Sequence, residues 1–322
     1  MRDFHEPTLI DVLDAAKRIH GYLQPTPLRS YPSLGRLLGA DVNIKHENHN
    51  PTGAFKVRGG INLVSRLTDD ERERGVIAAS TGNHGQSVAY AARLFGVSAI
   101  ICAPENANSV KVESMQDLGA EVILQGERFD DARLNAARLA KEHGYRYIDS
   151  GDEPLLIAGV GTHTLEMLQE QPATDVVIVP IGGGSGAAGA CIVAKAVNPQ
   201  IEVIGVQSEQ APAAYESWKQ RELREAPNRT RAEGLATGAP FELPQRILRR
   251  LLDDFVLVTD DEIDVATALM IEKTRTLVEA AGAAPLAAAL KIKERLRGRN
   301  VALICSGGNI SPAQLVHVLQ RP

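Results

Sequence analysis

Short apolar runs alternate with segments of helical periodicity along most of the chain. Within 85–96, for example, Val88, Ala91, Ala92 and Phe95 show the three-and-four spacing of one buried helix face. Strand-like apolar runs fall at 76–80, 97–104, 121–126, 146–150, 175–182, 201–208 and 301–307, and helical segments at 85–96, 109–119, 129–144 and 186–197. Apolar strands separated by helices are typical of parallel sheets buried on both faces, so the pattern predicts an α/β fold.

The same pattern predicts two lobes, each with an open parallel or mixed sheet. Because the block 76–150 and the block 175–208 each form a compact unit, we expect a large domain of residues 1–74 and 152–322. A small α/β domain of residues 75–151 would be inserted into it. A capping box over residues 259–262 predicts a helix that runs to about Ala280. The polar stretch 209–245 contains several Pro and Gly residues and predicts a loop or hinge.

Composition narrows the possible functions. The 322 residues are 44% hydrophobic and 23% charged, as in soluble globular proteins, and exceed the roughly 250–300 residues of one hydrophobic core. A net charge of −5 and only 4% aromatic residues argue against a nucleic-acid partner. No run approaches the roughly 20 apolar residues of a membrane span, and the N-terminus does not resemble a secretion signal. Three widely spaced cysteines in apolar runs (Cys102, Cys191 and Cys305) predict reduced, buried thiols and a cytoplasmic location.

Residues 50–60 place a lysine in apolar surroundings. A Pro-Thr-Gly turn leads to Lys56, which lies between Phe55 and Val57 at a possible helix start. An amine in such surroundings has a lowered pKa, and its neutral form can make a Schiff base. The alternative is a surface lysine whose ammonium group reaches water.

Residues 80–86 form a polar turn between a predicted strand and a predicted helix. Ser80, Thr81, Asn83 and His84 bring short polar side chains to the carboxyl end of a parallel strand, where α/β sheets bind ligands. The unpaired N–H groups of the helix start predict a site for a carboxylate. The alternative is an ordinary capped turn.

A glycine-rich loop follows the run 175–182. Three consecutive glycines before a helix allow backbone N–H groups to surround a phosphate. Gly184, Gly186 and Gly189 also match the dinucleotide fingerprint, and Glu209 lies 20 residues further on. A nicotinamide-dependent dehydrogenase is therefore an alternative for this loop alone. It leaves the lysine motif and the 80–86 turn unexplained.

Two further groups of polar residues could take part in binding or catalysis. Ser306 follows the last predicted strand and precedes a flexible Gly-Gly pair, so it offers a hydroxyl at the same sheet edge. His46, Glu47 and His49 lie close together but lack the spacing of a helical zinc pair, and we interpret them as loop residues. No metal site is predicted.

In this order, PTGAFK at 51–56, STGNH at 80–84, the glycine loop and SGGN at 306–309 are highly specific in combination. With them, nearly the whole chain resembles the fold-type-II (tryptophan synthase β-like) pyridoxal-phosphate enzymes, within them the serine/threonine dehydratase and serine racemase group. The length suggests the short catabolic form without a regulatory domain. The sequence around 182–189 and 235–238 also resembles dehydratases of hydroxyectoine-utilisation clusters.

The resemblance implies a role for each matching residue. Lys56 would hold pyridoxal phosphate and act as the base at the substrate Cα, with Thr81 as a second catalytic group. The substrate carboxylate would lie among Ser80, Thr81, Gly82 and His84. The other cofactor-binding residues would be Phe55 beside the ring, Asn83 at the ring hydroxyl, Ser306 at the ring nitrogen, Gly182, Gly183, Gly184 and Ser185 at the phosphate, and Gly234 and Glu279 at the site edge.

The implied reaction is β-elimination from a threonine- or serine-like L-hydroxy amino acid, giving a 2-oxo acid and ammonia. A racemase, a 3-hydroxyaspartate-type ammonia-lyase, or a cofactor-binding protein without turnover are the alternatives on this scaffold. Three features depart from the family: Ala54 replaces a usual Ser, Thr81 replaces Ser or Ala, and Gln207 and Ala213 stand where the family's divalent-cation site has acids. The family also suggests a homodimer.

Overall fold

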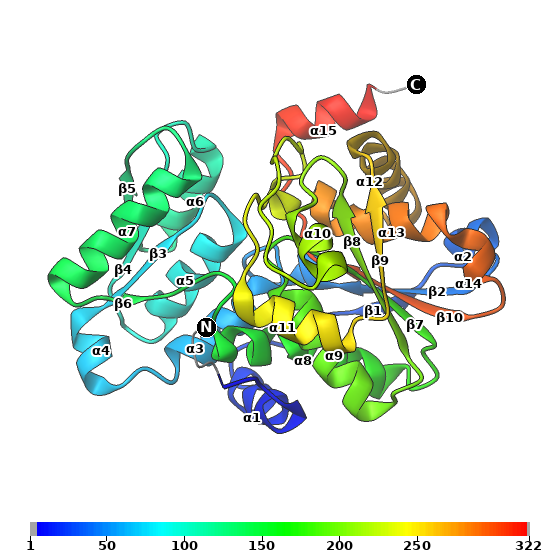
Figure 1. Cartoon of the computed structure of the whole chain (residues 1–322), viewed down its shortest axis with the longest axis horizontal. Coiled ribbons are helices and arrows are strands. Elements are labelled where there is room, and N and C mark those ends of the chain that lie inside the picture. The colour runs from blue at the N-terminus through cyan, green and yellow to red at the C-terminus, as the bar shows by residue number, and fades with distance from the viewer. Residues whose placement is uncertain (1–4, 321–322) are drawn as a thin grey trace.

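The computed structural model describes residues 5–320 and contains two β-sheets with helices around them (Figure 1). The larger sheet has six strands in the order β1-β2-β10-β7-β8-β9. Only β1 is antiparallel to its neighbour, and the remaining pairs are parallel. The bounds are β1 Leu28–Ser30, β2 Asp41–His46, β7 Val176–Pro180, β8 Glu202–Ser208, β9 Asp254–Val258 and β10 Asn300–Cys305.

The smaller sheet has four parallel strands in the order β5-β4-β3-β6. They are β3 Val76–Ala79, β4 Ala99–Ala103, β5 Glu121–Leu124 and β6 Arg146–Tyr147, and α5 Asn83–Leu94, α6 Ser109–Asp117 and α7 Phe129–His143 connect them. Because this sheet falls between β2 and β7 in the chain, it interrupts the larger sheet in sequence. The predicted α/β class with parallel sheets is confirmed.

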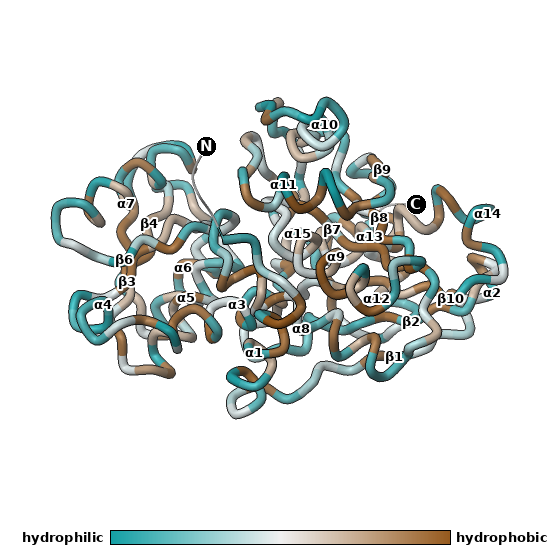
Figure 2. Tube along the Cα trace, turned by 60° about the horizontal axis from the view of Figure 1, so that its bottom comes forward, coloured by the Kyte–Doolittle hydropathy of each residue, from teal (hydrophilic) through white to brown (hydrophobic). Residues whose placement is uncertain are grey.

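The strands of the larger sheet bury both faces. Val177 and Val179 belong to one hydrophobic cluster, whereas Val176 and Ile178 belong to a second one on the other face. The two faces carry α1 Leu9–Ile19, α8 Pro154–Glu170, α9 Ser185–Val197 and α11 Glu242–Leu251 against α2 Pro32–Leu38, α12 Asp260–Thr274 and α13 Ala280–Lys291. Side chains alternate along a strand, so both alternating sets must be apolar. Figure 2 shows hydrophobic stretches along α9 and hydrophilic ones at the periphery, as in α4 Asp69–Arg74.

The helix α3 Lys56–Val64 lies between the two sheets and packs closely against α5 and α8. Glycines make this close approach possible. A Cβ at Gly60 would lie 2.6 Å from the Ser87 backbone oxygen, and one at Gly159 would lie 2.8 Å from the Gly59 Cα. The first hydrophobic cluster also contains residues of both sheets, such as Ala78 and Val177. The helix that carries Lys56 is therefore held by both halves of the molecule.

The C-terminal half differs from the expected structure in the length of one helix and in the helical content of the stretch 209–245. The helix predicted to run to about Ala280 ends at Thr274, because Arg275 has a left-handed backbone with φ of 57°. A second helix, α13, then begins at Ala280. The polar stretch 209–245 contains α10 Ala213–Gln220, the short turn η2 Glu233–Leu235 and the start of α11. The remaining helices are α14 Lys293–Leu296 and α15 Pro312–Leu319.

The three cysteines are free and buried, as predicted from their apolar runs. Burial raises the pKa of the Cys102 thiol to about 11 and that of Cys191 and Cys305 still further, so none is a reactive thiolate. No helix within residues 5–320 is both long and apolar enough to cross a membrane.

Replacement of Gly159 by Ala tests the close packing of α3 on α8. The new methyl group would lie 2.7 Å from the Arg58 backbone oxygen. Backbone atoms cannot move aside cheaply, so we expect Gly159→Ala to lower the free energy of unfolding by about 1–3 kcal/mol. Gly21→Ala is the control, because no atom lies within 4 Å of its added Cβ. Thermal unfolding followed by circular dichroism measures both, and equal melting temperatures would contradict the packing argument.

Candidate active site

Four segments singled out in the sequence meet at the carboxyl ends of the strands. The turn 80–82 follows β3, the glycine loop 181–184 follows β7, and Ser306 follows β10. Lys56 is the first residue of α3, as its Pro-Thr-Gly turn predicts. The carboxyl edge of parallel sheets is where α/β proteins bind ligands, so the fold places these segments where a site is expected.

The amine of Lys56 is held by two acceptors. Its Nζ lies 2.9 Å from the Ser185 Oγ and 2.9 Å from the Ser150 backbone oxygen. Burial lowers the pKa of Lys56 from 10.5 to about 8, and the Asp149 carboxylate opposes this shift. The alternative of an ordinary surface lysine is therefore wrong. A large share of this amine is neutral near pH 8 and able to act as a nucleophile or base.

The glycine loop presents backbone donors. Within residues 5–320, the N–H groups of residues 182–187 donate to no acceptor. Gly184 adopts a left-handed backbone with φ of 94°, and a Cβ at Gly182 would lie 2.3 Å from the Gly234 backbone oxygen. With the Ser185 hydroxyl at the start of α9, these groups make an anion cradle at a helix N-terminus. Gly182, Gly183, Gly184 and Ser185 all belong to this cradle, and their contact with a phosphate stays a prediction.

The 80–84 turn presents a second set of donors. Ser80 is committed to the turn itself, because its Oγ accepts from the N–H groups of Gly82 at 3.1 Å and Gly85 at 2.8 Å. The N–H groups of Thr81, Asn83 and His84 have no acceptor in the described chain. Three such donors at the start of α5 could bind a carboxylate.

His84 is a neutral residue at this turn. Its Nε2 lies 3.3 Å from the Ile148 backbone oxygen, and its Nδ1 is buried without a hydrogen-bond partner in the described part of the chain. Burial, followed by the charge of Lys56, lowers the pKa of His84 to about 4. His84 therefore lies near the amine without adding a charge at neutral pH.

Asn83, Glu279 and Gly234 line the opposite edge of the site. The Asn83 Nδ2 donates to the Glu279 Oε1 at 2.7 Å, and the Asn309 Nδ2 donates to the Asn83 Oδ1 at 2.8 Å. Burial raises the pKa of Glu279. A Cβ at Gly234 would lie 2.7 Å from that of Ala281 and 3.7 Å from the Glu279 Oε1. The chain therefore requires glycine at this wall.

Ser306 and Phe55 are joined through the backbone. The Phe55 N–H donates to the Ser306 backbone oxygen at 3.0 Å, and Ala54 forms an isolated bridge with Gly307. The Ser306 hydroxyl has no hydrogen-bond partner among residues 5–320. The Phe55 ring centroid lies 5.5 Å from the Lys56 Nζ. The Phe55 ring thus lies beside the amine, and the backbone of Phe55 links it to the loop that carries the Ser306 hydroxyl.

Several residues of the site escaped the sequence analysis. Ser150 and Asn309 contribute a backbone oxygen and a side-chain amide. The buried amine of Lys111 on α6 pairs with Glu233 of η2, and both line a cavity of about 340 Å³ next to Gly234 and Glu279. A lysine inside a polar helix gives no sequence signal of burial, whereas Asn309 lay within a motif already singled out.

The residues that the sequence analysis considered for metal binding lie in two places. Gln207 is buried and accepts from the Tyr215 N–H at 3.1 Å, and Ala213 begins α10. His46 ends β2, and Glu47 is fully buried in the short turn η1 Glu47–His49. Glu47 and His49 thus lie in a short connecting turn, and the sequence analysis did not foresee the buried ion pair of Glu47 with Arg58.

Comparisons with known proteins agree with this geometry. Residues 19–307 match the family described as pyridoxal-phosphate dependent enzymes. The chain belongs to this family, and pyridoxal phosphate is its cofactor. The residues present fit that group: unpaired amides for the phosphate, a buried amine for the aldehyde and an uncommitted Ser306 hydroxyl for the ring. The family match favours this cofactor over the nicotinamide alternative.

Relatives and solved structures narrow the class further. The chain is 36% identical over 315 residues to an L-threonine ammonia-lyase of Thermotoga maritima, covering 98% of this chain and 78% of that one. It is 38% identical over 322 residues to a catabolic L-threonine dehydratase of Staphylococcus aureus, covering 98% and 93%. Maize serine racemase superposes with a TM-score of 0.93 at 31% identity, covering 98% and 97%. Threonine deaminase isoform 2 of Solanum lycopersicum gives 0.92 at 31%, covering 96% and 91%. The protein is a pyridoxal-phosphate-dependent lyase.

The lowered pKa of Lys56 predicts how cofactor uptake depends on pH. Only the neutral amine attacks an aldehyde, so uptake by cofactor-free protein should rise about tenfold per pH unit up to about pH 8 and then level off. A lysine at its ordinary pKa of 10.5 would keep rising. Asp149→Asn removes the carboxylate that opposes the shift, so its midpoint should lie at lower pH. Absorbance of the bound cofactor measures both, and a midpoint unmoved by Asp149→Asn would contradict the role given to that carboxylate.

Proposed function

We propose that the protein is an ammonia-lyase that removes the β-hydroxyl and the amino group of a threonine- or serine-like L-amino acid, giving a 2-oxo acid and ammonia. The observation that carries the proposal is the buried Lys56 amine, which lies between an anion cradle at 182–187 and a carboxylate site at 81–84. Relatives named as threonine ammonia-lyase and threonine dehydratase support the reaction and the substrate class.

The site assigns each cofactor contact to a residue of this chain. Lys56 would hold the aldehyde carbon, and the amides of Gly182, Gly183 and Gly184 with the Ser185 hydroxyl would hold the phosphate. The others would line the ring: Phe55 at its side, Gly234 and Glu279 at its edge, Asn83 at its hydroxyl and Ser306 at its nitrogen. When bound, pyridoxal phosphate supplies an electron-accepting ring that weakens bonds at the substrate Cα.

The 80–84 turn would orient the substrate. Its carboxylate would accept from the N–H groups of Thr81, Asn83 and His84, with the Thr81 hydroxyl and the Gly82 backbone beside it. Ser80 would hold the turn in shape rather than contact the substrate, because its hydroxyl already accepts two turn amides. Neutral His84 would not compete with the substrate amino group for the carboxylate.

Lys56 would also move the proton. Its free amine would lie within the site and accept the proton of the substrate Cα. A pKa of about 8 leaves part of this amine in its basic form near neutral pH. Ser306 offers a neutral partner to the ring nitrogen, and an aspartate would offer a charge. We propose that this neutral partner favours prompt loss of the β-hydroxyl over reactions that need a long-lived carbanion.

Racemisation is the second candidate, and Thr81 is the observation that favours it. Its side chain is half-buried at the substrate turn, and its hydroxyl has no hydrogen-bond partner in the described chain. A hydroxyl on the face opposite Lys56 would serve as a second acid or base. Neighbours that are serine racemases support this reading. A 3-hydroxyaspartate-type lyase and the hydroxyectoine-utilisation subgroup remain predictions.

The organisation of the chain supports a further proposal. We propose a small domain of residues 75–151 inserted into a large domain of residues 1–74 and 152–322, because the four-stranded sheet falls within the first range. A homodimer and a cytoplasmic location also stay proposals, supported by the family and by three free buried thiols. Sedimentation and cell fractionation would test the last two.

Removal of the Lys56 amine tests the proposed function. We expect Lys56→Ala to lower production of 2-oxo acid from L-threonine and L-serine by at least about 10³-fold, since the variant lacks both nucleophile and base. Lys17→Ala is the control, because Lys17 is an exposed lysine of α1. A coupled assay for the 2-oxo acid, with the absorbance of the bound cofactor, measures both. Turnover that survives in Lys56→Ala would overturn the assignment.

Assays of the wild-type protein test which amino acid is the substrate. If the cofactor binds and neither amino acid yields a 2-oxo acid, the threonine- or serine-like proposal is wrong and hydroxyaspartate is tested next.

Substitution of Thr81 separates elimination from racemisation. Thr81→Val keeps the shape of the side chain and removes its hydroxyl. If Thr81 is a second acid or base, loss of optical purity in recovered L-serine should slow at least about tenfold while 2-oxo acid production changes less than about threefold. Chiral chromatography and the 2-oxo acid assay measure the two rates. Equal slowing of both reactions would show that Thr81 binds substrate rather than moving a proton.

A further inference from the structure

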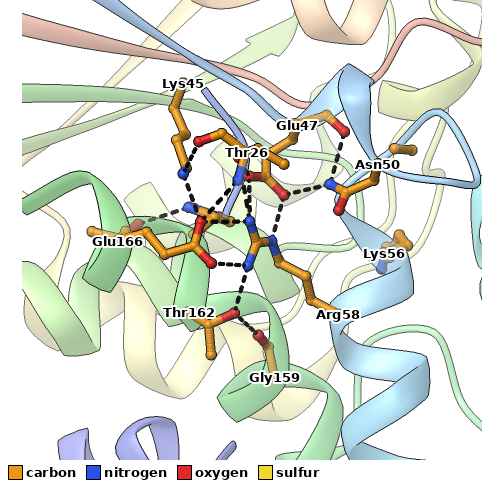
Figure 3. Close-up of polar contacts among 12 residues, drawn as sticks. Thr26, Lys45, Glu47, Asn50, Lys56, Arg58, Gly159, Thr162 and Glu166 are labelled. Carbon is orange, nitrogen blue, oxygen red and sulfur yellow. Dashed lines mark hydrogen bonds and ion pairs between the residues drawn. The ribbon is translucent and has the colours of Figure 1, made fainter. Parts of the chain in front are cut away.

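A closed cluster of charged side chains lies beside the first turn of α3 (Figure 3). The Arg58 Nε and Nη2 donate to the Glu47 Oε2 at 2.6 Å and Oε1 at 2.9 Å. Its Nη1 and Nη2 donate to the Glu166 Oε1 at 2.6 Å and Oε2 at 2.7 Å. Arg58 and Glu47 are fully buried. One guanidinium thus joins η1, α3 and α8 by two bidentate pairs, the strongest geometry available to arginine.

The remaining polar groups of the cluster are also satisfied. The Lys45 Nζ donates to the Glu166 Oε2 at 2.6 Å and to the Thr26 backbone oxygen at 2.7 Å. The Thr26 hydroxyl donates to the Glu47 Oε1 at 2.5 Å, and the Arg58 Nη1 donates to the Thr162 hydroxyl at 3.1 Å. Two cations and two carboxylates make the cluster neutral overall. Such a cluster is costly to disturb, because loss of one partner leaves a buried charge unpaired.

The cluster closes the segment that carries Lys56. Arg58 lies two residues after Lys56 in the same helical turn, and Glu47 lies just before the turn that leads to it. Glu47 also accepts from the Asn50 Nδ2 at 2.9 Å. The carboxylate at the start of the segment 47–58 therefore binds both the turn within it and the arginine at its end.

One other side chain anchors the start of α3, since the Ser87 Oγ donates to the Lys56 backbone oxygen at 2.6 Å. Its N-cap residue, Phe55, makes no capping hydrogen bond, whereas α4, α6, α12 and α15 have side-chain caps. An uncapped first turn tends to fray. Lys56 is the first residue of that turn, and its Nζ must reach the Ser185 Oγ and the Ser150 oxygen. A small rotation of the turn would move the amine away from both.

We propose that Arg58 is a positioning residue for Lys56, and that its ion pairs with Glu47 and Glu166 fix the first turn of α3 and hold the amine against Ser185. The proposal rests on the proposed function of Lys56. An ordinary structural ion pair would affect only the stability of the protein. The proposal predicts, in addition, a change in kcat and in the pH midpoint of cofactor uptake.

Arg58→Lys tests the geometry at constant charge. A lysine keeps the positive charge and loses the bidentate fork. We expect kcat for 2-oxo acid formation to fall at least about tenfold, with KM changed less than about twofold, since a misplaced catalytic group slows the reaction and the carboxylate site at 81–84 is untouched. The control is Arg299→Lys, which disturbs the Arg299–Glu202 pair (2.6 Å). This pair lies at the amino ends of β10 and β8, whereas the site lies at the carboxyl ends of the strands. The control should lose stability without this change in kcat.

Glu47→Gln tests the charge balance at constant shape. Arg58 then keeps only one charged partner, so the first turn of α3 should shift. This shift would draw the Lys56 amine away from the Ser185 Oγ and the Ser150 oxygen, the acceptors that favour its protonated form. We expect the pH midpoint of cofactor uptake to fall by at least about half a unit, whereas Glu202→Gln should leave it unchanged. Absorbance of the bound cofactor gives this midpoint without substrate turnover. A purely structural ion pair would lower the melting temperature and leave the midpoint in place.

The outcomes separate this proposal from the proposed function. If the wild-type protein takes up the cofactor but acts on no hydroxy amino acid, the proposed function fails while the Glu47→Gln midpoint still tests the position of Lys56. If Arg58→Lys does not fold, Glu166→Gln is the milder substitute, since the Glu166 side chain is 20% exposed. Folded variants with wild-type kcat and an unchanged midpoint would overturn the proposal.

Discussion

The structure depends on keeping one amine out of water at the point where two sheets meet. Desolvation is the largest influence on the pKa of Lys56 and brings it to about 8. Within residues 5–320 the amine is held by two neutral oxygens, those of Ser185 and Ser150, and forms no direct ion pair. This arrangement leaves part of the amine neutral near pH 8, the form that can act as a nucleophile or base. It also requires a tightly packed helix to carry it.

The rest of the fold supplies that packing. α3 lies between α5 and α8, where glycines replace side chains that would clash with the neighbouring backbone. The same residue type serves a second purpose in the 182–184 loop, where the absence of Cβ atoms leaves amides open to an anion. Glycine thus permits close helix contact around α3 and leaves unpaired amides in the loop next to Ser185.

The charged side chains around the site pair with one another in two separate groups. Lys45, Glu47, Arg58 and Glu166 neutralise one another beside α3, and Lys111 with Glu233 joins α6 to η2 on the far side. The substrate turn itself carries neutral groups, since the pKa of His84 is lowered to about 4. The unpaired backbone amides at the starts of α5 and α9 are therefore groups near Lys56 that could bind an anion.

The sequence alone determined the features that depend on neighbouring residues. The apolar runs predicted the strands, and the turns at 51–56, 80–84 and 182–185 predicted which groups meet at the sheet edge, because glycine and turn chemistry is local. The end of α12 at Thr274 was missed, since a left-handed Arg275 has no clear sequence signal. Only the tertiary structure decided the partners of Glu47, Arg58 and Lys111. Arg58 and Glu166 are 108 residues apart, and Lys111 and Glu233 are 122 apart, so only the packing of distant elements brings such charges together.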